Sequence, residues 1–366
     1  MTQGKINLFK PTLGNAELAA VKEVFDSGWI GYGPRCEGVE KAWSFTVGAK
    51  HGVATNSCTS ALQIALKLRG IGPGCKVIIP TITFAATAEA VLAVGATPVF
   101  VDVHPDTLLI NLDSIPREQH DADAIIVVLY AGQVLDLGDS FMSIPIIYDC
   151  AHAAGSSFNA GGKLCCWSFQ AVKNLGCGDG GMVTMDSESD QVRAKTLAWH
   201  GISRSTWDRA SGKHYTWDYD VRETGFKGQM NDITAAILSV QIERMGELQT
   251  MRRHVAYQYL RKLNGVDVVC NGGRADLCGW HLFVIKSDRR NELAAYLQER
   301  RIVTGVHYRP LHLHTAFAPQ VPLPVAEHEW QRILSLPMHP QLTQDDVASV
   351  CDCINWFTSQ KAEVAA

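Results

Sequence analysis

A lysine and an aspartate, set in two separate motifs, offer the most specific chemistry in this sequence. Lys173 stands in SFQAVKNLGCGDGG, 24 residues after Asp149, which ends the apolar run PIIYD. A buried lysine with a lowered pKa can attack a carbonyl and hold an aldehyde cofactor as a Schiff base. A strand-end aspartate can keep a pyridine nitrogen protonated, which makes the ring an electron sink. Together they predict pyridoxal phosphate chemistry, although each alone is more often a solvated lysine or a capping aspartate.

Three further segments offer contacts for such a cofactor. In NSCTSALQIAL, Ser57, Thr59 and Ser60 lie where a strand gives way to a helix, whose free N–H groups and dipole favour a phosphate. Phe84 follows another strand end and could stack on a flat ring. His152 follows Asp149 and could contact a ring hydroxyl. Plain N-capping and core packing are the alternative interpretations of these residues.

The glycines after the lysine satisfy the dinucleotide fingerprint GxGxxG at Gly176, Gly178 and Gly181. That fingerprint requires a helix opening at the glycines. Here the apolar segment GMVTMD follows and is typical of a strand. We therefore reject NAD binding and expect a tight, closely packed turn.

Uniformly apolar runs alternate with helical stretches, which predicts an α/β fold around a mainly parallel, seven-stranded sheet covered on both faces. We expect a large cofactor-binding domain over 1–245, with an N-terminal helical segment, and a smaller α/β domain over 246–366. The predicted strands of the large domain are 52–55, 76–80, 97–103, 124–130, 145–149, 165–169 and 181–186. Long amphipathic helices are expected over 232–264, strands over 280–286 and 302–308, and helices over 290–300 and 345–357.

Composition narrows the class of protein. Of 366 residues, 46% are hydrophobic and 19% charged, an ordinary globular balance, and the net charge of −4 gives no electrostatic reason to expect nucleic acid or an anionic membrane as partner. No apolar run approaches the ~20 residues that span a bilayer. The N-terminus lacks the apolar core of a signal peptide. Eleven scattered cysteines without zinc-type spacing suggest free thiols, so we expect a cytoplasmic protein.

The order of the motifs resembles the DegT/DnrJ/EryC1/StrS family of sugar aminotransferases, which have the aspartate aminotransferase-like (type I) fold. The resemblance runs nearly end to end, through SGWIGYGP, TNSCTSAL, TFAATAEAVLAVGATPVFVDV, YDCAHA, SFQAVKNLGCGDGGMV, GFKGQMNDITAAI, VHYRPLHLH and LSLPMHP. It implies that pyridoxal 5'-phosphate is the cofactor, that Lys173 binds it as a Schiff base and that Asp149 pairs with its pyridine nitrogen. It places Phe84 on the ring face and His152 near the ring hydroxyl.

The resemblance also implies a phosphate cradle and a dimer. Cys58, Thr59 and Ser168 match cradle positions, and Cys58 departs from the commoner glycine or alanine without removing the backbone N–H. Lys227 in GFKGQMND stands where many members use asparagine to reach the phosphate of the neighbouring subunit, which implies a homodimer with shared active sites. A solvated surface lysine is the alternative.

The substrate residues are suggested by two loops. His307, Tyr308 and Arg309 in HYRPLHLH match the small-domain loop that lines the sugar-nucleotide site in the family, and Trp29 and Tyr32 lie in an early glycine-rich loop. The histidine spacing in HYRPLHLH is not a usual zinc pattern, so we expect no metal.

The activity that the resemblance implies is transamination of a nucleotide-linked keto-sugar, of the 4-keto- or 3-keto-6-deoxyhexose type, with glutamate as amino donor. Members with histidine at the lysine position catalyse deoxygenation, and Lys173 argues against that branch. An aminotransferase acting on a free cyclitol or cyclic ketone, and a non-catalytic regulatory relative, are the alternatives.

Overall fold

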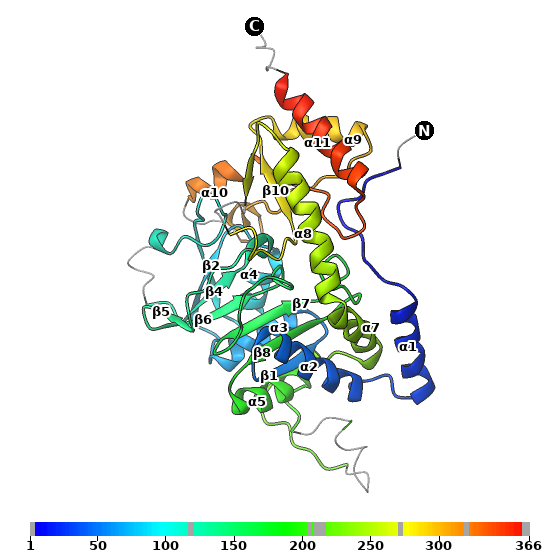
Figure 1. Ribbon diagram of the computed structural model, residues 1–366. Helices are drawn as coiled ribbons and strands as arrows, with labels where there is room; N and C mark the ends of the chain where they lie inside the picture. Colours follow the sequence, from blue (N-terminus) through cyan, green and yellow to red (C-terminus); the bar gives the residue numbers. More distant parts are fainter. Residues whose placement is uncertain are drawn as a thin grey trace.

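A mostly parallel sheet forms the centre of the larger, N-terminal part of the molecule (Figure 1). The computed structural model describes residues 4–115, 121–203, 207, 217–269, 274–317 and 322–360. The strand order is β1-β8-β7-β6-β4-β2-β3, with β8 antiparallel to both neighbours and the two-residue β5 (Ser140–Phe141) beside β6. All seven predicted strands are confirmed: β1 (His51–Thr55), β2 (Lys76–Pro80), β3 (Thr97–Val101), β4 (Ala124–Val128), β6 (Ile144–Asp149), β7 (Leu164–Ser168) and β8 (Gly181–Met185).

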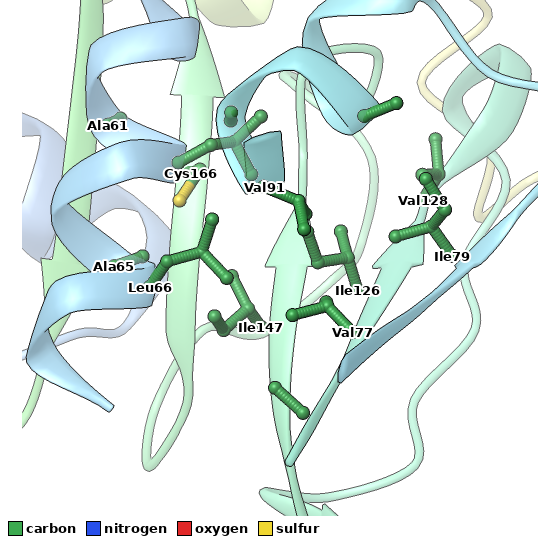
Figure 2. Packing of buried hydrophobic residues seen from close by; sticks show 14 of the residues in the cluster. Ala61, Ala65, Leu66, Val77, Ile79, Val91, Ile126, Val128, Ile147 and Cys166 are labelled. Carbon is green, nitrogen blue, oxygen red and sulfur yellow. The ribbon is translucent and has the colours of Figure 1, made fainter. Parts of the chain in front are cut away.

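Helices cover both faces of this sheet because its strands are apolar on both sides. Successive strand residues point to opposite faces, so Ile126 packs into one cluster and Val127 into the other. Figure 2 shows Leu66 of α3 beside Ile147 of β6. The first face is covered by α3 (Cys58–Leu68), α4 (Ala85–Ala93) and α5 (Glu188–Ala198), and the second by α2 (Pro34–Val47) and α7 (Asp232–Glu243), against which α1 (Asn15–Ser27) packs.

The C-terminal part is a smaller antiparallel sheet with its own hydrophobic cluster. Its strands lie in the order β11-β10-β9, and the long helix α8 runs between the two parts of the molecule (Figure 1). The domain boundary at 245/246 stays a prediction. The elements described here are α8 (Met245–Lys262), β9 (Asp267–Val269), β10 (Phe283–Lys286), α9 (Arg290–Glu299), α10 (Pro324–Glu329), β11 (Ile333–Leu336) and α11 (Gln344–Ser359). The 3-10 turns within the described ranges of the chain are η1 (Leu112–Ser114), η3 (Tyr130–Gly132) and η4 (Leu311–Leu313).

The structure corrects two predictions in this part. The strand expected from residue 280 begins only at Phe283, because Trp280 has a φ of 49°, which is not extended backbone. The strand predicted over 302–308 is wrong. That segment makes only isolated bridges, from Ile302 to Ile6 and from Gly305 to Ser335, so its last residues are not held in a ladder.

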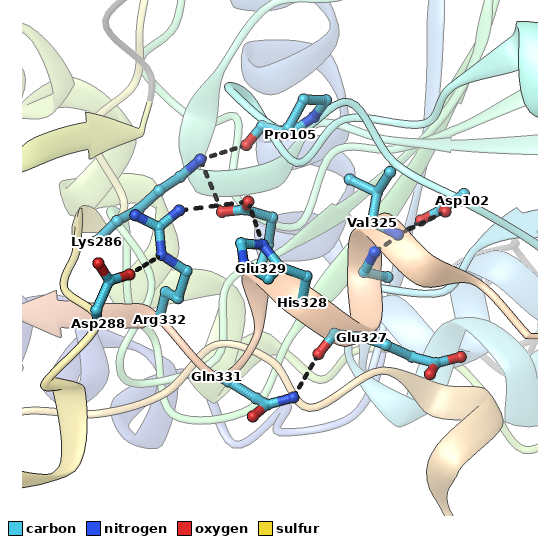
Figure 3. A network of polar contacts seen from close by, with 11 residues as sticks. Asp102, Pro105, Lys286, Asp288, Val325, Glu327, His328, Glu329, Gln331 and Arg332 are labelled. Atoms are coloured by element: carbon cyan, nitrogen blue, oxygen red, sulfur yellow. Dashed lines mark hydrogen bonds and ion pairs between the residues drawn. The ribbon is translucent and has the colours of Figure 1, made fainter.

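A polar network fastens the small sheet to the loop after β3 (Figure 3). Asp102 accepts a hydrogen bond from the backbone N–H of Ala326 at 2.8 Å and so caps the start of α10. Lys286, at the end of β10, donates to the carbonyl oxygen of Pro105 at 2.5 Å and pairs with Glu329 at 2.9 Å. These contacts join the edge of the large sheet to the C-terminal part. No helix of the described ranges is long and apolar enough to cross a membrane.

Candidate active site

A cavity of about 410 Å³ lies where β6 and β7 end and α3 and α4 begin. Parallel strands place their carboxyl ends on one edge of the sheet, and ligands of such folds bind there. The segment after residue 306 covers the cavity from the C-terminal part. The structure brings nine of the predicted residues to this one space: Cys58, Thr59, Phe84, Asp149, His152, Ser168, Lys173, His307 and Tyr308.

Asp149 is a buried carboxylate held by donors from two elements. Its Oδ2 accepts a hydrogen bond from the hydroxyl of Thr87 at 2.9 Å, and its Oδ1 accepts one from the N–H of Ala151 at 3.1 Å. Burial raises its pKa, while these two donors and the nearby charge of Lys173 oppose that rise. A cationic partner, such as a protonated pyridine nitrogen, would keep this carboxylate ionised.

Thr87 is a site residue that the sequence prediction missed. It lies in the first turn of α4, three positions after Phe84, a spacing that places two residues on the same side of a helix. Its hydroxyl also lies 2.8 Å from that of Thr83. Since Thr87 donates to the carboxylate, we assign Thr83 as the donor to Thr87. The i, i+3 spacing was the available signal.

Lys173 is half-buried and lines the cavity. Burial lowers its pKa to about 8, although the charge of Asp149 acts in the opposite direction. At pH 7 about a tenth of such an amine is neutral, compared with roughly three in ten thousand at an ordinary lysine pKa. The lowered pKa therefore raises the fraction of neutral amine, which is the form that attacks a carbonyl.

The glycine-rich segment after Lys173 forms the tight turn that was predicted. A Cβ at Gly176 would lie 2.7 Å from the carbonyl oxygen of Ala171, and Gly178 has a φ of 97°, so neither position admits a side chain without strain. Strand β8 begins at Gly181, which confirms the strand expected in place of a dinucleotide-binding helix.

Asn174, next to the lysine, is a second residue that the sequence prediction missed. Its side-chain amide donates to the carbonyl oxygens of Ala154 and Gly279, both at 2.7 Å. Its Oδ1 therefore accepts from Nδ1 of His281 at 3.2 Å. Because these partners lie in the loop after β6 and in the C-terminal part, Asn174 fixes the Lys173 turn against both. No local pattern signals this role.

A backbone N–H group from another segment holds His152 in one tautomer. Its Nδ1 accepts the N–H of Ala131 at 3.2 Å, so we assign the proton to Nε2, which lies 3.1 Å from the hydroxyl of Tyr308. Burial lowers the pKa of His152 well below its usual value, with the Lys173 charge acting in the same direction. The neutral ring thus donates to Tyr308 and orients that hydroxyl.

The start of α3 has the geometry that an anion cradle requires. Helix starts leave N–H groups without helical partners, and the side chain of Ser57 caps α3 by accepting from the N–H of Ser60 at 3.2 Å. Strand β8 packs so closely that a Cβ at Gly181 would lie 2.5 Å from the nitrogen of Cys58. Burial raises the pKa of the Cys58 thiol, with the Asp149 charge adding to the effect, so the thiol stays neutral. A phosphate fits this cradle.

Phe84 completes the fit to a flat cofactor. Its side chain is 60% exposed although it lines the cavity, so a ring face is available for stacking. Its ring centroid lies 5.9 Å from that of Tyr308. The Lys173 amine would suit an aldehyde and the buried Asp149 carboxylate a pyridine nitrogen. The start of α3 would suit a phosphate, and the exposed face of Phe84 a planar ring.

Four predicted residues are not among the described residues that line this cavity. Lys227 is exposed, and its Nζ lies 4.0 Å from the ring centroid of Trp199. Arg309 is exposed and donates to the carbonyl oxygen of Leu313 at 2.8 Å. Their roles stay predictions.

The other two lie in the early glycine-rich loop. The indole N–H of Trp29 donates to the carbonyl oxygen of Tyr32 at 2.9 Å, which closes the loop on itself. The hydroxyl of Tyr32 donates to Glu40 at 3.0 Å, and the ring is partly buried at the start of α2. Their contact with substrate also stays a prediction.

A lysine with a lowered pKa and a buried aspartate share one cavity at the carboxyl edge of this sheet, an arrangement that suits a pyridoxal phosphate-dependent enzyme of fold type I. The sequence model of the DegT/DnrJ/EryC1/StrS aminotransferase family matches residues 11–355. The chain belongs to this family and is an aminotransferase that uses pyridoxal phosphate.

Known relatives support the same conclusion. The chain is 34% identical over 375 aligned residues to the spore coat polysaccharide biosynthesis protein SpsC of Bacillus subtilis (strain 168), covering 94% of this chain and 95% of that one. Spr1654 of Streptococcus pneumoniae, solved in a PLP form, matches with a TM-score of 0.87 and 26% identity, over 97% of this chain and 99% of that one. DesV of S. venezuelae, solved in complex with a ketimine intermediate, matches with a TM-score of 0.83 and 30% identity, over 94% of this chain and 95% of that one.

Proposed function

We propose that this enzyme transfers the amino group of glutamate to a nucleotide-linked keto-sugar of the 3-keto- or 4-keto-6-deoxyhexose type. The observation that carries the proposal is the Lys173 amine, with a pKa of about 8, in one cavity with Asp149. The choice of a sugar as acceptor is supported by relatives such as the sugar aminotransferase CalS13 of Micromonospora echinospora, 28% identical with a TM-score of 0.83 over 96% of this chain and 99% of that one. We further propose that the enzyme works in the cytoplasm as a homodimer.

When bound, pyridoxal phosphate supplies an aldehyde that captures amines and a ring that delocalises the electrons of a deprotonated carbon. Lys173 removes the proton from the α-carbon of the donor as a general base and returns a proton as a general acid. Asp149 keeps the pyridine nitrogen protonated, with Thr87 and Ala151 holding the carboxylate in place.

The remaining residues bind and orient. The start of α3, at Cys58 and Thr59, and the buried Ser168 hold the phosphate. Phe84 offers its exposed face to the ring. His152 donates to Tyr308 and so directs that hydroxyl toward the cavity that both residues line.

The test is a two-part assay that separates chemistry from substrate choice. Holoenzyme is mixed with glutamate alone, and the release of 2-oxoglutarate is measured in a single turnover. It is then given nucleotide-linked 3-keto- and 4-keto-sugars or inosose-type cyclic ketones. We expect wild type to complete the half-reaction and to prefer the nucleotide-linked acceptors, Lys173→Ala to lose the half-reaction, and the exposed-site control Lys22→Ala to match wild type.

Two outcomes would contradict the proposal. Turnover of the cyclic ketones alone would assign the enzyme to cyclitol-type acceptors. Cofactor binding without any release of 2-oxoglutarate would favour a regulatory relative that does not turn over.

A further inference from the structure

A second cavity, of about 720 Å³, lies on the C-terminal part and shares no lining residue with the active-site cavity. One wall is a face of α9, where Asn291 and Gln298 are spaced by two helical turns. The other wall is the segment 302–306, which was predicted as a strand and makes only isolated bridges. The result is an open groove between a helix and an irregular segment.

The charged residues of this groove are all cationic. Lys5, Arg290 and Arg301 line it, and no carboxylate is among the described lining residues. Within the described ranges none of the three forms an ion pair. The chain as a whole carries a net charge of −4, so this concentration of positive charge is local. Such a groove attracts anions.

Arg290 is the only buried one of the three cations that line the groove. It is only 8% exposed, and its Nε has no hydrogen-bond partner among the described residues. Its guanidinium contacts the ring of Trp330, 5.7 Å from the ring centroid, which supplies no acceptor oxygen. Burial lowers the pKa of Arg290 without any carboxylate to oppose it. A buried polar group without a partner is costly, so an anion that accepts a hydrogen bond from it would offset that cost.

We propose that this groove binds a small phosphate-bearing anion, with Arg290 as the principal ligand and Arg301 and Lys5 as supporting charges. The planar fork of a guanidinium matches phosphate oxygens through two parallel N–H bonds. Asn291 and Thr304 add neutral hydrogen-bonding groups to the lining. Apolar lining residues (Ala294, Ala295, Ile302, Val303, Val306 and Leu334) leave room for an organic group attached to the phosphate. Free phosphate and a phosphorylated metabolite share the chemistry that this site recognises.

The first test measures binding to the holoenzyme, in which the cofactor already fills the phosphate cradle at α3. Inorganic phosphate and a hexose phosphate are titrated separately by calorimetry at low ionic strength, against wild type, Arg290→Gln, Arg301→Gln and Arg300→Gln. Arg300 is the matched control because it follows α9 directly but donates to the carbonyl oxygen of Tyr296 and does not line the groove. We expect the Kd of either probe to rise about tenfold or more in Arg290→Gln and Arg301→Gln, and to stay unchanged in Arg300→Gln.

A second measurement keeps the proposal testable if Arg290→Gln folds poorly. Arg301 is exposed, so Arg301→Gln should fold. The Kd of either probe is expected to rise in this variant as it does in Arg290→Gln. Holoenzyme crystals soaked in tungstate, an anomalously scattering phosphate analogue, should show a peak between Arg290 and Arg301. Binding that is unaffected by both variants, or crystals without a peak in the groove, would overturn the assignment. Neither result depends on turnover of any sugar, so the proposed function could fail while the anion site stands.

Discussion

The hydrogen bond from Thr87 to Asp149 offers the sharpest test of how this site works. Thr87→Val replaces the hydroxyl by a methyl group of nearly the same volume, so the fold around α4 should persist. The substitution leaves the buried Oδ2 of Asp149 without its 2.9 Å donor. It also leaves the hydroxyl of Thr83 without its 2.8 Å partner. The pKa of Asp149, already raised by burial, should rise further.

The expected loss follows from the kind of bond removed. A hydrogen bond to a charged group contributes about 1.5–3 kcal/mol. If this hydrogen bond stabilises the ionised carboxylate mainly in the transition state, in which the protonated ring nitrogen delocalises charge, kcat should fall about 10- to 150-fold. Thr87→Ser keeps the hydroxyl and should retain most of the activity.

The assay is the single-turnover release of 2-oxoglutarate from glutamate, with the cofactor absorbance band recorded to show that the cofactor stays bound. Asp149→Asn should also retain cofactor and lose most turnover. Because we infer that Thr87 acts through Asp149, adding Thr87→Val to Asp149→Asn should change the rate less than twofold.

Two results would refute the reasoning. A Thr87→Val enzyme with a rate within twofold of wild type would show that the donor is not needed. If Thr87→Val lowers the rate as much in the Asp149→Asn enzyme as it does in wild type, Thr87 acts on something other than the carboxylate.

Two further predictions concern the lysines. Cofactor-free enzyme should become more stable between pH 8 and 10.5, because the folded pKa of Lys173, about 8, is below its ordinary 10.5 and the unfolded chain binds more protons in that window. The increment should be up to about 3 kcal/mol in denaturant unfolding and absent from Lys173→Met, and identical pH profiles of the two proteins would contradict it. If Lys227 serves the partner subunit, mixing inactive Lys173→Ala and Lys227→Ala should restore about a quarter of wild-type activity through heterodimers with one intact site. No recovery after subunit exchange, which native mass spectrometry can verify, would count against a shared site.

Local patterns were enough to predict the sheet, and together with the resemblance to a known family they indicated the candidate site. The seven strands of the large domain could be read from uniformly apolar runs because burial on both faces imposes that pattern. Lys173 precedes a glycine-rich turn and Asp149 ends an apolar strand. Both features can be recognised from residues that are adjacent in the sequence. The segment 302–308 misled because its apolar residues Ile302 and Val306 pack against the hydrophobic clusters without pairing as a strand.

The partners of those residues depend on contacts between distant segments. Thr87 reaches Asp149 across 62 positions, and Asn174 reaches Gly279 across 105. The tautomer of His152 follows from one backbone N–H at Ala131, which a φ of 58° presents to the ring. A hydrogen bond is short and directional, so it forms only when packing sets two segments within about 3 Å, and periodicity along the chain carries no record of that distance. Residue types and their order thus specified the chemistry, and the packed fold decided which groups hold it in place.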